Sequence, residues 1–166
     1  MLSNKKSKIL LRKIQASDNA IIAKIIRDSL EEYQLNLPGT VYTDPTTDDL
    51  HGLFQPKNAT YWIAVNHDEV VGGCGIFPTE KLPEQTAELV KLYVKKEFRG
   101  FRIGQQLVEQ CINTSKKLGY TQLYLESFPS LKEAISLYHK KGFRKINEPM
   151  GDSGHFTCNY YMLLQL

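Results

Sequence analysis

The sequence predicts an α/β fold whose mixed, mainly antiparallel sheet contains a central βαβ unit and carries helices on both faces. Two strand-like runs within residues 60–77 are joined by the polar turn Asn66-His67-Asp68, a pattern typical of an antiparallel hairpin. Downstream, a strand-like run over 87–94, an amphipathic helix over 103–118 and a strand over 121–126 follow one another. That succession is the order of a βαβ unit.

Hydrophobic periodicity predicts the elements of the first half. A strand over 9–14 precedes Ser17 and Asp18, which are good helix caps, and a helix over about 19–34. The apolar face of that helix consists of Ile21, Ile22, Ile25, Ile26, Leu30 and Tyr33. The elements that follow are a loop marked by Pro38-Gly39 and Asp44-Pro45, a short helix over 47–54, and the hairpin strands 60–65 and 69–77.

The second half begins with a loop over 78–85 and continues into the βαβ unit. The helix over 103–118 places apolar residues on one face and ends at Gly119. Ser130 and Glu133 have the spacing of a capping box, which predicts a helix to about Lys141, ended by Gly142. The last predicted elements are strands over 143–146 and 155–164 around a turn at 150–154.

The composition is that of an ordinary globular protein. The chain has 166 residues, of which 42% are hydrophobic and 23% charged, enough for one compact domain. A net charge of +3 is too small to argue for nucleic acid. The three cysteines, Cys74, Cys111 and Cys158, are odd in number and widely spaced, which favours a reducing compartment over a disulfide scaffold.

No targeting or membrane segment is expected. The N-terminal residues 1–13 carry charges on both sides of a three-residue apolar run, which is too short for a signal peptide. No apolar run of the sequence is long enough to span a bilayer. We therefore expect a cytoplasmic protein that binds neither membrane nor nucleic acid.

A glycine-containing loop at residues 99–104 joins the strand over 87–94 to the helix that follows. Free backbone N–H groups and the positive end of the helix dipole point at the same place in such a junction, so it can bind phosphate. The alternative is a tight turn without a ligand. The loop lacks the Gly-Lys-Ser/Thr ending of a P-loop and is not a GxGxxG sequence, which disfavours other nucleotide-binding folds.

Two motifs resemble the GCN5-related N-acetyltransferase (GNAT) family. The first, Arg99-Gly100-Phe101-Arg102-Ile103-Gly104, resembles the family signature Arg/Gln-x-x-Gly-x-Gly/Ala at a strand-to-helix junction. The second runs from Ala134 to Phe143 and is similar to the later family helix with its tyrosine and the Gly-Phe after it. The resemblance covers residues 8 to 166 and implies that residues 1–166 form a single acyl-coenzyme A N-acyltransferase domain.

The resemblance implies that acetyl-coenzyme A is the acyl donor. The strand over 88–94 would diverge from the strand over 121–126, pair with the pantetheine arm, and polarise the thioester carbonyl with an amide near Val94. The implied cofactor-binding residues are Leu92, Tyr93, Val94, Arg99, Gly100, Phe101, Arg102, Ile103, Gly104 and Gln105. No metal is expected, because His155 and Cys158 stand alone without a metal-ligand pattern.

Two side chains are candidates for the chemistry. Tyr138 corresponds to the family tyrosine near the thioester sulfur and would protonate the leaving thiolate; the alternative is a core tyrosine with a satisfied hydroxyl. Glu88 lies six residues before Val94, where some family members carry a glutamate that takes the amine proton through water. Its alternative is a carboxylate in solvent at a strand end.

Two positions depart from the family pattern. The middle glycine of the signature is Arg102, and a β-carbon is expected there only if the backbone avoids left-handed angles. The position that is often asparagine is Leu131, so a polar contact to the pantetheine arm is either missing or supplied by Ser127 or Ser130.

The predicted reaction is direct transfer of an acetyl group to a primary amine of a small molecule or peptide. The acceptor site is expected from the helix over 19–34, the loop over 35–59 and the terminal hairpin, where His155 would face the cleft. Acidic residues in these regions weakly favour a cationic acceptor: Glu31, Glu32, Asp44, Asp48 and Asp49. A non-catalytic acyl-coenzyme A binding or sensing module is the alternative function, and a homodimer is left open.

Overall fold

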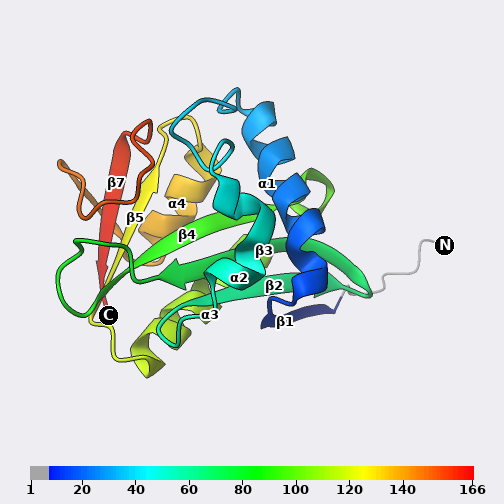
Figure 1. Ribbon diagram of the computed structural model, residues 1–166, viewed down its shortest axis with the longest axis horizontal. Coiled ribbons are helices and arrows are strands. Elements are labelled where there is room, and N and C mark those ends of the chain that lie inside the picture. Colours follow the sequence, from blue (N-terminus) through cyan, green and yellow to red (C-terminus); the bar gives the residue numbers. More distant parts are fainter. Residues whose placement is uncertain (1–7) are drawn as a thin grey trace.

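The computed structural model describes residues 8–166. Seven strands of this part of the chain form one sheet in the order β1-β2-β3-β4-β5-β7-β6 (Figure 1). The strands are β1 (Ile9–Lys13), β2 (Thr60–Asn66), β3 (Glu69–Phe77), β4 (Thr86–Val94), β5 (Gln122–Ser127), β6 (Arg144–Ile146) and β7 (Tyr160–Gln165). Among the described strands, only β4 and β5 pair in parallel, so the predicted mixed, mainly antiparallel sheet is confirmed.

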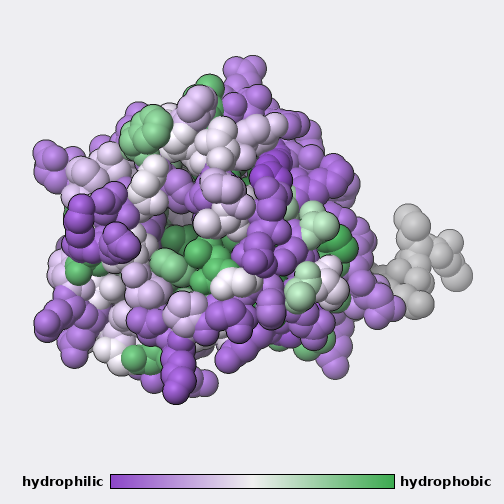
Figure 2. Space-filling view, in the orientation of Figure 1, coloured by the Kyte–Doolittle hydropathy of each residue, from purple (hydrophilic) through white to green (hydrophobic). Residues whose placement is uncertain are grey.

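Helices cover both faces of the sheet, as predicted (Figure 1). One core contains the apolar residues of α1 (Asn19–Glu32) and α2 (Leu50–Leu53). The opposite core contains those of α3 (Ile103–Lys117) and α4 (Lys132–Lys140). Figure 2 shows a recessed apolar area in the middle of the α1 and α2 side, bordered by hydrophilic residues. The helices on this side therefore leave part of the sheet face uncovered.

Two differences between the predicted and the observed elements affect the site, and the helix predicted over 47–54 is a 3-10 helix, Pro45–Asp49, followed by the short α2. The α4 helix begins at Lys132 with Leu131 as its N-cap and no side-chain cap bond, so the capping box predicted for Ser130 and Glu133 is wrong. The last strand begins only at Tyr160. Residues 155–158 instead form a turn, and the Thr157 amide donates to the Gly39 carbonyl at 3.2 Å, so this segment binds another loop rather than the sheet.

Two helices end just before the glycines that the sequence indicated as their stops. Gly119, with φ +85°, follows α3, and Gly142, with φ +96°, follows α4, in the left-handed region that glycine adopts most easily. None of the helices described is long and apolar enough to cross a membrane. The N-terminal stretch 1–7, on which the expectation about a signal peptide depends, lies outside the described residues.

An irregularity in β4 sets the geometry of the site. The pairing of β3 with β4 shifts register between Gly73 and Gly75, and Lys91 has φ 53°. An extra residue of this kind is a β-bulge, which bends a strand and turns a side chain. The hydroxyl of the buried Tyr61 donates to the Lys91 carbonyl at 2.8 Å, which holds the bulge in place.

Candidate active site

The two strands of the βαβ unit separate after a short paired stretch. β4 and β5 pair at Thr86, Ala87 and Glu88, and their pairing ends there. The rest of β4, up to Val94, therefore presents an edge that β5 does not cover. This fork matches the divergence expected from the family resemblance, and it leaves backbone groups of β4 available to an extended ligand.

The loop before α3 presents free backbone donors. In the described chain, the N–H groups of residues 100–105 have no hydrogen-bond acceptor. The first turn of a helix leaves such groups unpaired, and the helix dipole adds positive potential there. This arrangement fits the pyrophosphate of coenzyme A.

Arg102 adopts the conformation that the sequence analysis expected it to avoid. Its backbone has φ 60° and ψ 20°, which is left-handed, and it serves as the N-cap of α3. The expectation that a β-carbon there requires other angles is therefore wrong. An L-residue held in this region costs roughly 1–2 kcal/mol, so the loop geometry imposes the conformation on arginine against its preference.

A groove of about 310 Å³ runs from this loop along β4. All the predicted cofactor-binding residues line it except Phe101, whose side chain is 61% exposed. Leu131 also lines the groove, whereas Ser130 is exposed and does not. Ser127 is buried and lies in an adjoining cavity, so of the two serines only Ser127 is placed to face a ligand.

The Arg99 side chain forms hydrogen bonds that connect the glycine loop to β4 and α1. Its Nε donates to the Val94 carbonyl at 3.0 Å, and its two terminal nitrogens donate to Glu32 at 2.9 Å and Ser29 at 3.2 Å. The guanidinium also lies 5.8 Å from the centre of the Tyr33 ring. These contacts tie β4, the glycine loop and α1 together at one end of the groove.

A second cavity of about 70 Å³ continues the groove into the fork. The two spaces share five lining residues: Leu30, Leu92, Tyr93, Leu131 and Ala134. Side chains of both candidate catalytic residues, Glu88 and Tyr138, line this inner cavity, and so does His155. We call it the acceptor cavity, because Leu30, Thr40 and His155 line it from the three regions where the acceptor site is expected from the sequence.

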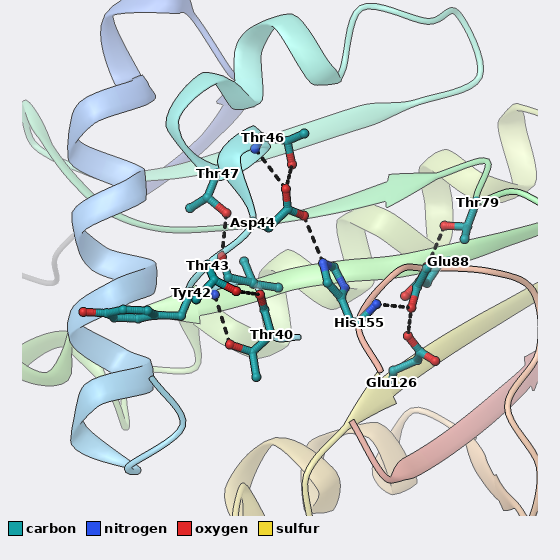
Figure 3. Close-up of polar contacts among 12 residues, drawn as sticks. Thr40, Tyr42, Thr43, Asp44, Thr46, Thr47, Thr79, Glu88, Glu126 and His155 are labelled. Atoms are coloured by element: carbon teal, nitrogen blue, oxygen red, sulfur yellow. Dashed lines mark hydrogen bonds and ion pairs between the residues drawn. The ribbon is translucent and has the colours of Figure 1, made fainter. Parts of the chain in front are cut away.

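Glu88 is buried at the base of the fork. Glu88 is only 4% exposed, which excludes the alternative of a carboxylate in solvent. Burial raises the pKa of Glu88 to about 7, with a further rise from Glu126, while the Thr79 hydroxyl at 2.6 Å and Lys91 act to lower it (Figure 3). A carboxyl group with such a pKa is suited to accept a proton near neutral pH.

Tyr138 points inward from α4. Its ring packs against Phe143 with centroids 5.7 Å apart. Burial raises the pKa of its hydroxyl above the ordinary value, so the group is fully protonated at neutral pH. Within residues 8–166 no hydrogen bond acts on this hydroxyl, in contrast to the core tyrosine with a satisfied hydroxyl that was the alternative.

His155 reaches the cavity from the loop before β7. Its Nε2 lies 3.0 Å from a carboxylate oxygen of Asp44, and Figure 3 shows this pair bridging the two loops above the cavity. Burial acts to raise the pKa of Asp44, but hydrogen bonds from His155 and Thr46 outweigh it and the pKa is lowered. His155 lines the acceptor cavity, whereas Asp44 does not.

The other acidic residues expected at the acceptor site are engaged elsewhere. Glu31 accepts from the Tyr42 hydroxyl at 2.6 Å, and Glu32 binds Arg99. Asp48 pairs with Arg27 at 2.6 Å, and Asp49 caps α2. None of these four carboxylates lines the acceptor cavity. The weak argument for a cationic acceptor that was based on them therefore loses its support.

Sequence reasoning assigned no role to three residues of the acceptor cavity and its wall. Glu126 (Figure 3) lines the cavity from β5, and its carboxylate accepts hydrogen bonds from Tyr124 at 2.8 Å and from Ser153. Thr79 reaches Glu88 from a loop, and Lys91 enters from the bulge. Only Glu126 carried a usable signal, since it lies on the strand predicted to flank Glu88.

A family model and a known relative match most of the chain. The sequence model described as the acetyltransferase (GNAT) family matches residues 23–143. An uncharacterized N-acetyltransferase of Escherichia coli K12, YjgM, is 34% identical over 158 residues, which cover 95% of each chain.

Solved structures share the fold. An acetyltransferase of the GNAT family from Staphylococcus aureus Mu50 superposes with a TM-score of 0.82 at 21% identity, covering 96% of this chain and 99% of that one. The PaiA N-acetyltransferase of Thermoplasma acidophilum, solved in complex with coenzyme A, superposes with a TM-score of 0.72 at 18% identity, covering 96% and 99%.

Proposed function

The chain belongs to the acetyltransferase (GNAT) family, and from this premise we propose that it transfers an acetyl group from acetyl-coenzyme A directly to a primary amine of a small molecule or peptide. One observation supports this most strongly. The groove that begins at the free amides of residues 100–105 leads into a cavity where Glu88 and Tyr138 face the same space. A donor site, a base and an acid are thus arranged in the order that acyl transfer needs.

The residues of the groove bind and orient the acyl donor. Backbone N–H groups of 100–105 hold the pyrophosphate, and the exposed edge of β4 from Leu92 to Val94 pairs with the pantetheine arm. The amide near Val94 polarises the thioester carbonyl. Apolar side chains of the groove, among them Leu131 and Leu137, exclude water from the arm.

Glu88 and Tyr138 move the two protons. Glu88 accepts a proton from the acceptor ammonium, whose ordinary pKa near ~10.4 would otherwise keep it protonated at neutral pH. The free amine attacks the thioester carbonyl carbon, a C–N bond forms and the C–S bond breaks. Tyr138 donates its hydroxyl proton to the thiolate and takes up the second proton, which the nitrogen loses on becoming an amide. The products are the acetylated amine, coenzyme A and one proton, which Glu88 releases to solvent.

A non-catalytic acyl-coenzyme A module would keep the groove without the two proton-transfer groups. The unpartnered hydroxyl of Tyr138 and the burial of Glu88 both favour the enzyme. We place the protein in the cytoplasm, because Cys74, Cys111 and Cys158 are free thiols and a reducing compartment keeps them so.

The decisive experiment incubates the protein with acetyl-coenzyme A and a panel of primary amines while free thiol release is followed. Turnover above the rate without an acceptor is expected for at least one amine, together with loss of that turnover in the double variant Glu88→Gln, Tyr138→Phe. Tight binding of coenzyme A by calorimetry without turnover on any amine would instead favour the binding module.

A further inference from the structure

Lys91 is a buried lysine that the proposed chemistry does not use. The β-bulge places it at φ 53°, and the Tyr61 hydroxyl holds its carbonyl at 2.8 Å. Lys91 is only 9% exposed, and it lines the acceptor cavity. Tyr61 thus fixes the backbone of a buried lysine that lines the space where an acceptor would bind.

The Lys91 ammonium has no hydrogen-bond or ion-pair partner in the described chain. Two less buried lysines do find one: Lys95, whose side chain is 28% exposed, contacts Glu69 at 2.6 Å, and Lys141, at 20%, contacts Glu109. A buried charge without a partner is costly, and buried charges in proteins are normally paired or bind a ligand. The exception therefore calls for a functional explanation.

Two carboxylates lie close enough to attract Lys91 without pairing with it. Asp44 and Glu88 both act electrostatically on the ammonium, yet neither comes within 4.0 Å of it. Asp44 is bound by His155, and Glu88 accepts from Thr79. Burial outweighs both carboxylates and lowers the pKa of Lys91. The positive charge is consequently compensated only in part by the protein.

We propose that the acceptor is a small amino acid whose carboxylate is bound by Lys91 while its amine faces Glu88. This inference rests on the proposed function and specifies the substrate class. Lys91 and Glu88 line one small cavity from the same strand, three residues apart, so the acceptor must carry its anionic group close to its amine. A free amino acid meets this requirement, whereas a polyamine or an internal peptide segment does not.

The test uses matched acceptors. Each proteinogenic amino acid is compared with its carboxamide and with the amine that lacks the carboxylate, at saturating acetyl-coenzyme A. For the preferred side chain, kcat/KM of the amino acid should exceed that of its carboxamide by roughly 10²-fold, because an uncompensated buried ammonium rejects the neutral analogue. Equal rates on acid and amide, or faster amides, would overturn the proposal.

Lys91→Met identifies the residue responsible. Methionine keeps the length of the side chain and removes its charge, so the variant is expected to fold, which a thermal unfolding scan checks. The ratio of acid to amide kcat/KM should fall by roughly 10²-fold. Lys57→Met removes a charge from an exposed loop residue and should leave the ratio unchanged. A preference for acids that survives Lys91→Met would contradict the assignment.

Failure of the proposed function would look different. If no amine is turned over, calorimetry with the same amino acids in the presence of coenzyme A still tests the cavity. Binding by the wild type that Lys91→Met abolishes would support the carboxylate site in a protein that does not catalyse the reaction. Amino acids that bind neither protein would overturn the inference. Turnover of neutral amines alone would support the enzyme and refute the substrate class.

Discussion

The hydroxyl of Thr79 donates a hydrogen bond of 2.6 Å to the carboxylate of Glu88. Thr79 comes from the loop between β3 and β4, and it stabilises the charged form of a carboxyl group that burial would keep neutral. The resulting pKa of about 7 places the change of charge of Glu88 in the range where a general base is most effective.

The first prediction concerns the pH dependence of turnover. The wild-type rate should rise with pH through an apparent pKa near 7, because Glu88 must be ionised to accept a proton. Glu88→Gln should be slow at neutral pH and recover partly as pH rises and free amine appears. Thr79→Val removes the hydrogen bond and should move the wild-type profile to higher pH. Superimposable profiles for wild type and Glu88→Gln would exclude Glu88 as the base.

The same pKa predicts an effect on stability. Folding raises the pKa of Glu88 from the ordinary 4.5 to about 7, so its contribution to stability is full below pH 4.5 and is lost as pH rises through 7. Glu88→Gln lacks this loss. Its free energy of unfolding relative to wild type should therefore increase between pH 5 and pH 8, by on the order of 3 kcal/mol at most. Urea unfolding at both pH values measures the difference, and a pH-independent difference would contradict the buried carboxyl.

Tyr138→Phe separates chemistry from packing. The substitution keeps the ring against Phe143 and deletes only the hydroxyl, which has no hydrogen bond among the described residues. If Tyr138 protonates the thiolate, kcat should fall by roughly 10²–10⁴-fold while coenzyme A affinity stays nearly unchanged. Steady-state kinetics and calorimetry give the two values. Unaltered kcat would return Tyr138 to a purely structural role.

Gly104 tests the donor site. A β-carbon built on Gly104 meets only Leu137 Cδ2 at 3.5 Å, so Gly104→Ala fits without rearrangement. Gly104→Val adds two further methyl groups at the groove, where backbone and ligand approach closely, and should weaken coenzyme A binding by roughly 10-fold or more. Calorimetry compares the two variants. Equal affinity in folded Gly104→Val protein would remove this turn of α3 from the site.

Arg102 provides a test of backbone strain. Arg102→Gly relieves the left-handed conformation at φ 60°, and stability should rise by roughly 0.5–1 kcal/mol after the greater flexibility of glycine in the unfolded chain is offset. Arg102→Ala keeps the strain and removes the guanidinium, so it should not gain stability. Denaturant unfolding of the wild type and the two variants measures these differences in stability. A destabilised Arg102→Gly variant would mean that contacts of the arginine side chain stabilise the fold by more than its left-handed backbone destabilises it.

Local patterns explain which parts of the site the sequence could predict. The glycine loop at 99–104 and Tyr138 depend on spacing within one or two neighbouring elements, and the structure brings them to one groove and its inner cavity. Lys91 was not predictable as a cavity residue, because a bulge changes the face on which a strand residue lies.

Contacts between distant segments account for the remaining differences. Residues 155–158 alternate in a way that indicates a strand, yet His155 pairs with Asp44, 111 residues earlier in the chain, and Thr157 binds the loop at 38–39. Those contacts hold the segment over the cavity instead of extending β7. The left-handed backbone of Arg102 is likewise imposed by the junction between β4 and α3, and no property of arginine indicates it.

The fork between β4 and β5 also has a mechanical consequence. Backbone pairing joins two stiff plates, β1 to β4 and β5 with β7 and β6, at three residue pairs beginning with Thr86 and Gln122. By geometry alone, a small change of angle at this seam would become a larger displacement at the open end of the fork. The room available to an acceptor therefore depends on the angle between the plates as well as on the cavity side chains. Substitutions at buried residues of the seam such as Ala87 and Leu123 can thus alter acceptor size without touching the acceptor.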